Sequence, residues 1–391
     1  MDPSSRLFRL SLLYGSIFGA FAVVFPFLPI YMDMRGLPPS RIGILLGIVE
    51  AAGVAAPLLI SRVADRTGRY RLLMTLAGLA AGLSFLLFHR WEPFWALAAA
   101  AAAFGLFYKP IAPLADALSG RALADSSRNY GRVRAWGTVS FIVVSLALQS
   151  TGLLEGASVR RLSTVILIAL MLPVAVMPAA PEVRRSSPSD SPRDEPAGRP
   201  KGFPGAYTTF LAVGFLGNIG FGVFRSFGSL YFNDLVGTRA VSGMYTLAAL
   251  SEIPVLVFGG LFLKRLGHRR MLTVSLAAMA VRSLVLAGLP HVLPAALSQL
   301  THAFTFGFYL IVGVDWVNRV VPEGRRALGM GLFMALSHGA AQLVGSVLGG
   351  FLLEAGGFGL MFGTATVFPL AAMAVLAVRR DIAGVAHLDA R

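Results

Sequence analysis

The segment Ala180–Lys201, APEVRRSSPSDSPRDEPAGRPK, determines how the chain is organised, because it interrupts an otherwise apolar sequence. Its proline, serine and charged residues favour neither a membrane-spanning helix nor a packed core. On both sides of it, apolar stretches recur that are long enough to cross ~30 Å of hydrocarbon. We place six stretches before it and six after it, near residues 8–32, 40–60, 72–88, 94–118, 133–152 and 162–178, and near 207–232, 241–263, 271–288, 293–318, 327–353 and 358–378.

The composition points to a membrane protein with many spans. Hydrophobic residues make up 56% of the chain and charged residues 14%, whereas soluble domains carry about 25% charged residues. The sequence contains no cysteine, which excludes disulfides and thiol chemistry. The predicted fold class is an all-α membrane protein, with twelve transmembrane helices in two pseudo-symmetric six-helix bundles. We expect one bundle in residues 1–178, a cytoplasmic linker in 179–206 and the second bundle in 207–391.

The basic residues predict the orientation in the membrane. Of the 34 Lys and Arg residues, 25 fall on one side of the predicted bundle and six on the other. Since cytoplasmic loops carry the excess of positive charge, both termini are expected in the cytoplasm, and the protein in the inner membrane. The net charge of +15 then needs no nucleic-acid partner. Three basic residues lie inside apolar spans instead: Lys109, Arg225 and Arg282.

The two halves echo each other at an offset of 199–200 residues. Matching residues fall at equivalent places in the predicted topology: Arg66 with Arg265, Gly68 with Gly267, Tyr31 with Tyr231, and Asp116 with Asp315. Parallel six-span repeats around a central cavity are the arrangement of the major facilitator superfamily. The chain resembles that superfamily, which implies its fold and transport by alternating access.

Two basic loops at this offset resemble the superfamily's loop signature. The first is SRVADRTGR, Ser61–Arg69, with Ser61 in place of the usual glycine. The second is GLFLKRLGHR, Gly260–Arg269, with Lys264 where an acid usually stands. A glycine permits a tight turn, and arginines can bridge to partners across the bundle. The resemblance implies a gating role for six residues, although ordinary basic loops are the alternative: Asp65, Arg66, Gly68, Arg69, Arg265 and Gly267.

Within the superfamily, the chain is similar to the lactose permease branch of proton symporters and its phenylpropionate- and nucleoside-type relatives. Three stretches carry this likeness: FPFLPIY at 25–31, YGRVRAWG at 130–137 and SEIP at 251–254. Lactose permease-like proteins also place an Arg and then a His at the spacing of Gly267, Arg282 and His302. The resemblance implies proton-coupled symport. The chain departs from the branch at Thr305, where those proteins carry an acid one turn beyond the His.

Three ionisable residues on consecutive spans are predicted at nearly the same depth: Glu252, Arg282 and His302. An ionisable side chain in mid-membrane costs roughly 2.5–3.5 kcal/mol on insertion scales, so it usually faces a cavity or a partner. A buried carboxylate suits proton coupling, because desolvation favours its protonated form and a nearby Arg favours the charged form. We predict Glu252 as the coupling acid, Arg282 as its modulator and His302 as a connector. The alternative is a static ion pair beside a core histidine.

Further polar and aromatic residues are candidates for binding a solute. Asp116 and Arg134 resemble the acid–arginine sugar pair of the branch, and Phe141 stands where the branch carries a stacking Trp. Arg134 is alternatively a loop arginine of the cytoplasmic side. Glu50 and Arg225 are predicted to pair across the halves, while the span of His338 also suits close helix packing. The full set of predicted binding residues is Asp116, Arg134, Phe141, Tyr31, Arg225, Glu50 and His338.

These patterns predict a secondary transporter that takes up a small organic solute with a proton. A sugar, a nucleoside and an aromatic acid all fit such a cavity. Efflux or uncoupled facilitated transport is the alternative, and a non-transporting sensor or enzyme on the same fold is a further one. No phosphate-loop or HExxH motif is present, so we expect no enzyme activity, cofactor or metal. The expected partners are the solute, the proton and the bilayer, with the protein acting as a monomer.

Overall fold

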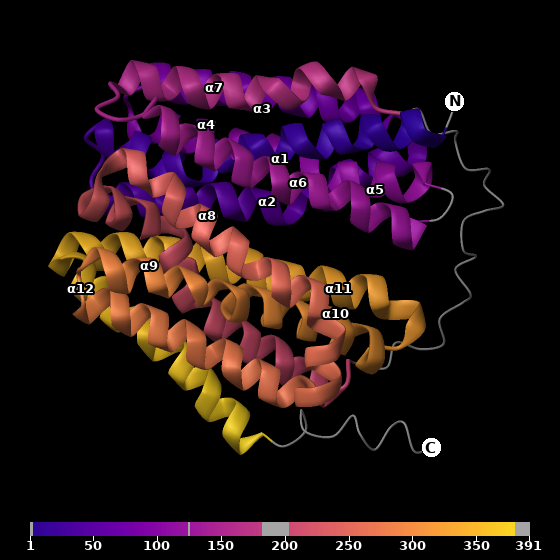
Figure 1. Ribbon diagram of the computed structural model, residues 1–391, viewed down its shortest axis with the longest axis vertical. Helices are drawn as coiled ribbons and strands as arrows, with labels where there is room; N and C mark the ends of the chain where they lie inside the picture. Colours follow the sequence, from indigo (N-terminus) through magenta and orange to yellow (C-terminus); the bar gives the residue numbers. More distant parts are fainter. Residues whose placement is uncertain (1–2, 124–125, 182–202, 380–391) are drawn as a thin grey trace. The chain divides into compact units, whose positions relative to one another are not determined.

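The computed structural model describes residues 3–123, 126–181 and 203–379, and these residues form helices without any strand. Figure 1 shows the helices as long rods. The predicted fold class, an all-α membrane protein, is therefore confirmed in its helical character. Most of the predicted linker at 179–206, namely residues 182–202, lies outside the described residues.

The first part of the chain contains seven helices. α1 packs against α6 and α7, and α3 packs against α4 and α7 (Figure 1). Between α4 and α5 the turn contains Pro110, which lacks a backbone N–H and therefore interrupts the helical hydrogen bonds. The bounds are α1 Pro3–Met34, α2 Pro39–Thr67, α3 Tyr70–Arg90, α4 Phe94–Tyr108, α5 Ile111–Ala122, α6 Ser126–Thr151 and α7 Val159–Val176, followed by a 3₁₀ turn at Met177–Ala179.

The second part contains two helices of unusual length and several shorter elements. Two turns of π-helix interrupt it, at Ala303–Phe308 and at Ala335–Ala340. Wider turns of this kind are rare in proteins and often occur at functional sites. The helices are α8 Gly205–Gly288, α9 Val292–Leu300, α10 Tyr309–Val320, α11 Arg326–Met334 and α12 Ala341–Val378, with a 3₁₀ turn at Glu323–Arg325.

Among the described residues, nine continuous helical stretches are long and apolar enough to cross a membrane. α8, with 84 residues, is too long for one crossing, since a span needs about 20 residues. Gly237 and Gly267, with φ of 75° and 71°, change the direction of the chain within it. Gly357, with φ of 72°, does the same within α12. Divided at these glycines, the nine stretches give the twelve segments that the sequence predicts.

The glycines with positive φ recur at equivalent positions in the two halves. Gly36 corresponds to Gly237, Gly68 to Gly267 and Gly156 to Gly357, at separations of 199–201 residues. A residue with a Cβ adopts this left-handed conformation only at a cost. The repeated turns therefore support the internal duplication that the sequence offset indicates.

The chain forms two compact units, which follow the predicted halves except for two short segments. Residues 38–47, at the start of α2, belong to the second unit, and residues 237–246 belong to the first. In the second unit, the Ser40 backbone N–H donates to Glu354 Oε2 at 3.0 Å. In the first unit, Arg239 Nε donates to the carbonyl oxygen of Gln149 at 2.9 Å. Each of the exchanged segments is thus fixed within its unit by polar contacts.

Candidate functional site

Glu252, His302 and Arg282 form a continuous polar chain in the second unit. Glu252 and Arg282 come from successive segments of α8, and His302 precedes the first π-helical turn. Glu252 Oε1 lies 2.6 Å from His302 Nε2. On the other side of the same ring, His302 Nδ1 lies 3.2 Å from Arg282 Nη1. The structure therefore brings together the three residues that the sequence predicts as the coupling group.

The partners of His302 determine where its proton lies. A guanidinium can only donate hydrogen bonds, so His302 Nδ1 accepts from Arg282. The proton of a neutral imidazole must then be on Nε2, which donates to Glu252 Oε1. In this arrangement His302 accepts from Arg282 on one side of its ring and donates to Glu252 on the other. His302 thus occupies the connecting position between the acid and the arginine.

Arg282 is held by groups that the sequence analysis did not identify. It is 1% exposed, and its Nη2 donates to Gln299 Oε1 at 2.5 Å. Its guanidinium carbon lies 3.6 Å from the ring centroid of Phe224, a distance at which a cation is attracted to the ring face. Gln299 was recognisable in principle, because it lies three residues before His302 and so shares its helix face.

Aromatic rings connect this chain to the second histidine of the unit. Phe306 stacks on His302 with a centroid distance of 5.7 Å, and it meets His338 edge-on at 6.2 Å. Phe221 lies 5.8 Å from His302. The positive charge of Arg225 interacts electrostatically with both His302 and His338. His338, in the second π-helical turn, has a buried Nδ1 with no hydrogen-bond partner among the described residues.

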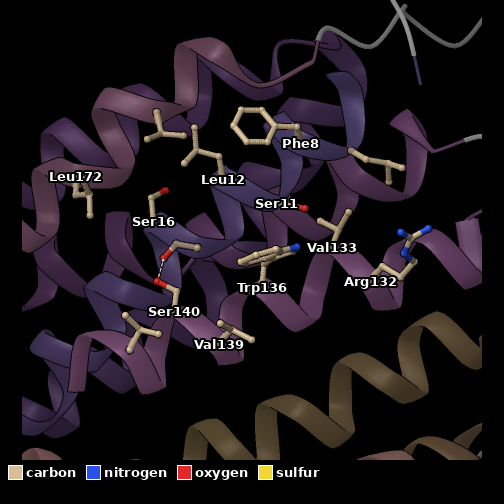
Figure 2. A pocket seen from close by; sticks show the side chains of 14 residues that line it. Phe8, Ser11, Leu12, Ser16, Arg132, Val133, Trp136, Val139, Ser140 and Leu172 are labelled. Carbon is tan, nitrogen blue, oxygen red and sulfur yellow. Dashed lines mark hydrogen bonds between the residues drawn. The ribbon is translucent and has the colours of Figure 1, made fainter. Parts of the chain in front are cut away.

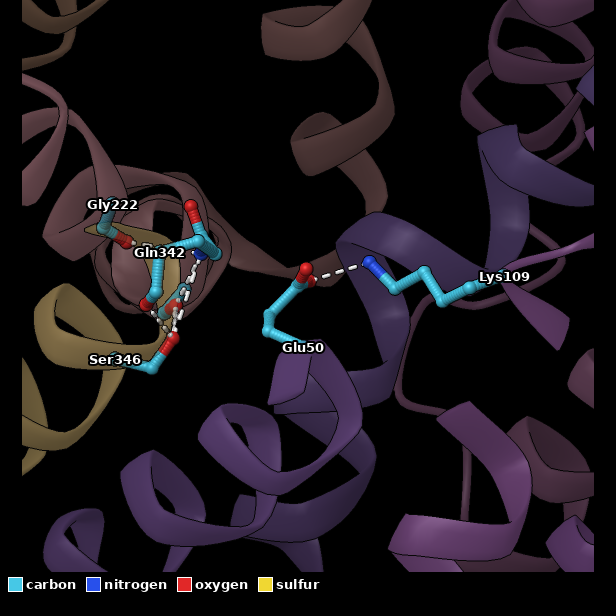
Figure 3. Close-up of polar contacts among 6 residues, drawn as sticks. Glu50, Lys109, Gly222, Gln342 and Ser346 are labelled. Atoms are coloured by element: carbon cyan, nitrogen blue, oxygen red, sulfur yellow. Dashed lines mark hydrogen bonds and ion pairs between the residues drawn. The ribbon is translucent and has the colours of Figure 1, made fainter. Parts of the chain in front are cut away.

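Near His338, α12 mainly packs against the first segment of α8. Gln342 Nε2 donates to Ser226 Oγ at 2.9 Å and to the carbonyl oxygen of Gly222 at 3.2 Å (Figure 3). Ser226 Oγ also lies 2.6 Å from Ser346 Oγ. These buried groups satisfy one another, so they link the two helices.

In the first unit, Glu50 forms an ion pair with Lys109. Glu50 Oε1 lies 2.6 Å from Lys109 Nζ (Figure 3), and both side chains are less than one-fifth exposed. Lys109 also lies 5.9 Å from the ring centroid of Phe25. The prediction that Glu50 pairs with Arg225 is therefore corrected. Apolar spans give no sign of which buried base an acid will meet, and here a base in the turn after α4 neutralises an acid on α2.

Asp116 and Arg134, the two residues that resemble the branch's sugar pair, have separate partners in this structure. Asp116 Oδ1 accepts from the Tyr14 hydroxyl at 2.6 Å and from the Tyr130 hydroxyl at 3.0 Å. Arg134 instead lies over the ring of Phe18, with its guanidinium carbon 4.0 Å from the centroid. Two tyrosine hydroxyls therefore satisfy the acid, and an aromatic face satisfies the base.

The remaining two binding candidates of the first unit differ in their placement. Tyr31 is fully buried on α1, and its hydroxyl lies 2.7 Å from His89 Nδ1. It also packs against Phe85, with ring centroids 5.4 Å apart. This is the environment of a core residue, in place of the predicted solute contact. Phe141 is half-buried on α6.

The two predicted gating loops differ in where their acidic partner comes from. Asp65 accepts from Arg121 Nη2 at 2.9 Å and from the Tyr70 hydroxyl. The second loop has no such acid, because Lys264 occupies that position. There, Asp315 from α10 lies 2.6 Å from His268 Nε2 and 2.7 Å from Arg319 Nε. An acid from a neighbouring helix therefore meets the second loop.

The other loop residues fit turns at the helix ends. Gly68 and Gly267 have φ of 70° and 71°, and they adopt the left-handed conformation that the motif requires. Arg66, Arg69 and Arg265 are exposed. Beside them, Arg269 Nη2 donates to the carbonyl oxygen of Leu376 at 2.7 Å, which ties the loop to the end of α12.

Two helical units with buried charges define a membrane transporter of the major facilitator fold. Residues 7–364 match the MFS_1 like family, and the chain belongs to that family. Members and neighbours of known type are transporters, so the protein is an integral membrane transporter of small solutes and not an enzyme.

Relatives and solved structures agree with this assignment. The chain is 26% identical over 385 residues to the maltose permease of Geobacillus stearothermophilus, covering 95% of each protein. It is 26% identical over 373 residues to a probable 3-phenylpropionic acid transporter of Escherichia coli (strain K12), covering 92% of this chain and 94% of that protein. The crystal structure of the nucleoside transporter NupG matches its fold with a TM-score of 0.77 at 18% identity, covering 96% and 99% of the two chains.

Proposed function

We propose that the protein takes up a small organic solute together with a proton, across the inner membrane and with both termini in the cytoplasm. The single observation that supports coupling is the chain from Glu252 through His302 to Arg282. This chain connects one protonatable acid to a permanent positive charge through the ring of His302. The ring can therefore couple the protonation of the acid to the charge of the arginine. Intramembrane ionisable residues of this kind are typical of proton pathways in carriers.

The chemistry of this chain links proton binding to conformation. In the observed arrangement, His302 donates to Glu252. When that carboxylate is ionised, the hydrogen bond is charge-assisted and about twice as strong as a neutral one. A proton on Glu252 replaces the charged bond with a neutral one. It thereby weakens the connection between Glu252 and His302. A carrier can use this loss to favour one of its two open states over the other.

Solute-dependent proton movement tests the proposal directly. Cells that express the chain are expected to alkalinise a weakly buffered medium when a transported solute is added, because each solute enters with a proton. A panel should contain a disaccharide, a nucleoside and an aromatic acid. Accumulation that collapses on addition of a protonophore supports coupling. Uptake that only equilibrates, with no change in external pH, contradicts it.

Uncoupled facilitated transport is the second candidate, and one observation favours it. Thr305 stands where the lactose permease-like branch carries an acid. Its hydroxyl donates to the carbonyl oxygen of His302 at 3.2 Å, and the residue is fully buried. This position therefore supplies a local helix contact and no proton site. Under this alternative Glu252 is a structural partner of His302.

The charges of the second unit favour an organic anion as the solute. Among the described residues, the charge cluster around His302 contains two arginines, Arg225 and Arg282, but one acid, Glu252. Arg282 faces that acid through His302, and no partner is recorded for Arg225 among the described residues. A positive charge within a span needs a partner. A carboxylate on the solute can supply it, with an aromatic portion against Phe306 and Phe221.

Replacing Arg225 with Gln is expected to raise the KM for an anionic solute by at least about tenfold, since a hydrogen bond to a charged group contributes roughly 1.5–3 kcal/mol. Uptake of 3-phenylpropionate is to be compared with uptake of its uncharged primary amide, for which little change is expected. Arg270→Gln removes the same charge at an exposed position and serves as the control. An equal effect of Arg225→Gln on both solutes contradicts the anion assignment.

A further inference from the structure

An apolar groove runs along the first unit, between α1, α6 and α7 (Figure 2). Its volume is about 600 Å³, within the range of ~300–1,000 Å³ that is typical of ligand sites. Phe8 and Leu12 line it from α1, Trp136 and Val139 from α6, and Leu172 from α7. These five side chains are 45% or more exposed, so the groove is open at the surface. It is separate from the charge clusters described above.

Small residues on α1 and α6 create the space. Ser11 and Gly15 on α1 and Ser140 on α6 lie on the floor of the groove, and none of them fills it. The Ser140 hydroxyl donates to the carbonyl oxygen of Gly15 at 2.6 Å (Figure 2), and Ser16 Oγ donates to that of Leu13 at 2.8 Å. These two hydroxyls are thus bonded to backbone carbonyls, and the rest of the lining is mostly apolar and suited to a hydrocarbon.

The length of the groove matches one leaflet of a bilayer. Its lining on α6 extends from Arg132 to Val143, which corresponds to ~16 Å at ~1.5 Å per residue. The hydrocarbon of a whole bilayer is ~30 Å thick. A transmembrane helix of a second copy or a partner would follow a stripe over the full thickness. A groove that ends halfway suits an acyl chain better.

One end of the groove carries its positive charge. Arg132 is exposed, no acid lines the groove, and no partner for Arg132 is recorded among the described residues. A guanidinium presents a planar fork of donors that matches the oxygens of a phosphate. One turn further along α6, Trp136 is 55% exposed and offers an indole N–H. Tryptophan in this position is typical of the level of lipid headgroups.

We propose that this groove binds an anionic phospholipid. One acyl chain lies along α1 and α6, and the phosphate accepts hydrogen bonds from Arg132. Charge complementarity selects the anionic headgroup, because the opening carries a positive charge and no negative one. The site is independent of the transported solute and of proton coupling.

Native mass spectrometry of the purified full-length protein tests this proposal. The protein is to be titrated with phosphatidylglycerol and phosphatidylcholine of identical acyl chains. Phosphatidylglycerol is expected to bind about fivefold more tightly, the effect of one basic residue worth ~1 kcal/mol at an anionic surface. Arg132→Ala should remove this preference, Arg132→Lys should keep most of it, and Ser11→Phe should reduce retention of both lipids by filling the groove.

The control is Arg62→Ala, which removes an exposed arginine of α2 outside the groove and should leave the preference unchanged. A thermal melt of each variant establishes that it is folded. The proposal is overturned by equal binding of the two lipids by the unmodified protein, by a preference that survives Arg132→Ala, or by unchanged lipid retention in Ser11→Phe. An Arg62→Ala variant that loses the preference as fully as Arg132→Ala also overturns it.

Discussion

Cells that carry Glu252→Gln are expected to lose uphill accumulation of solute while they retain exchange of internal for external solute. Glutamine has nearly the same shape as glutamate and still accepts a hydrogen bond from His302 Nε2. It cannot bind and release a proton, so the proton gradient can no longer drive accumulation of the solute. Under a gradient, the ratio of internal to external solute should fall to about one.

Two assays on one vesicle preparation separate these effects. Counterflow of labelled solute measures exchange, and an imposed pH gradient measures accumulation. Glu323→Gln is the matched control, because this acid is 90% exposed in a loop and should behave like the unmodified protein. Full uphill uptake by Glu252→Gln would refute Glu252 as the coupling acid. Loss of both activities would indicate a structural role instead.

Arg282→Ala is expected to have the largest effect on stability. Removal of this 1% exposed side chain leaves Gln299 Oε1 and His302 Nδ1 without their donor and Glu252 without its opposing charge. Breaking a buried charged interaction from one side costs about 3–5 kcal/mol. We expect a clear fall in the melting temperature in detergent and no measurable transport.

A second variant separates lost charge balance from lost packing. The double variant Arg282→Ala with Glu252→Gln removes both charges at the ends of the Glu252–His302–Arg282 contacts. Part of the lost stability should therefore return, while coupling stays absent. Arg282→Lys keeps the charge without the planar fork and should be intermediate in both measurements. An Arg282→Ala protein as stable as the unmodified protein would show that the residue is not the centre of this network.

The fold was predictable because hydrophobic length and loop charge are properties of the sequence alone. Ala180–Lys201 and the repeated Gly68 and Gly267 led to two six-span halves, and the family and fold comparisons agree. The ends of the helices were harder to predict from the sequence, since α8 continues through two predicted turns with only single glycines interrupting it.

The proximity of Glu252, Arg282 and His302 was predictable because depth in the membrane follows from position along a span. Which side chains are in contact was harder to predict, since contact also depends on how each helix is oriented about its own axis. Glu50 illustrates this limit: its ion pair is with Lys109, whereas the rule that intramembrane charges find partners suggested Arg225. Tyr31 and Asp116 show another limit, because their partners His89 and Tyr14 are ordinary core residues by sequence.

The ring of Phe224 against Arg282 has a consequence for how the carrier works. With its flat face covered at 3.6 Å and one edge bound to Gln299, the guanidinium has little freedom to swing. Arg282 therefore behaves as a stationary reference point. Under the proposed coupling, we expect a change in distance between the acid and this charge to come from Glu252, through its side-chain rotamer or through its helical segment. In the proposed coupling cycle, the acid is then the group that moves and the arginine is the group that stays in place.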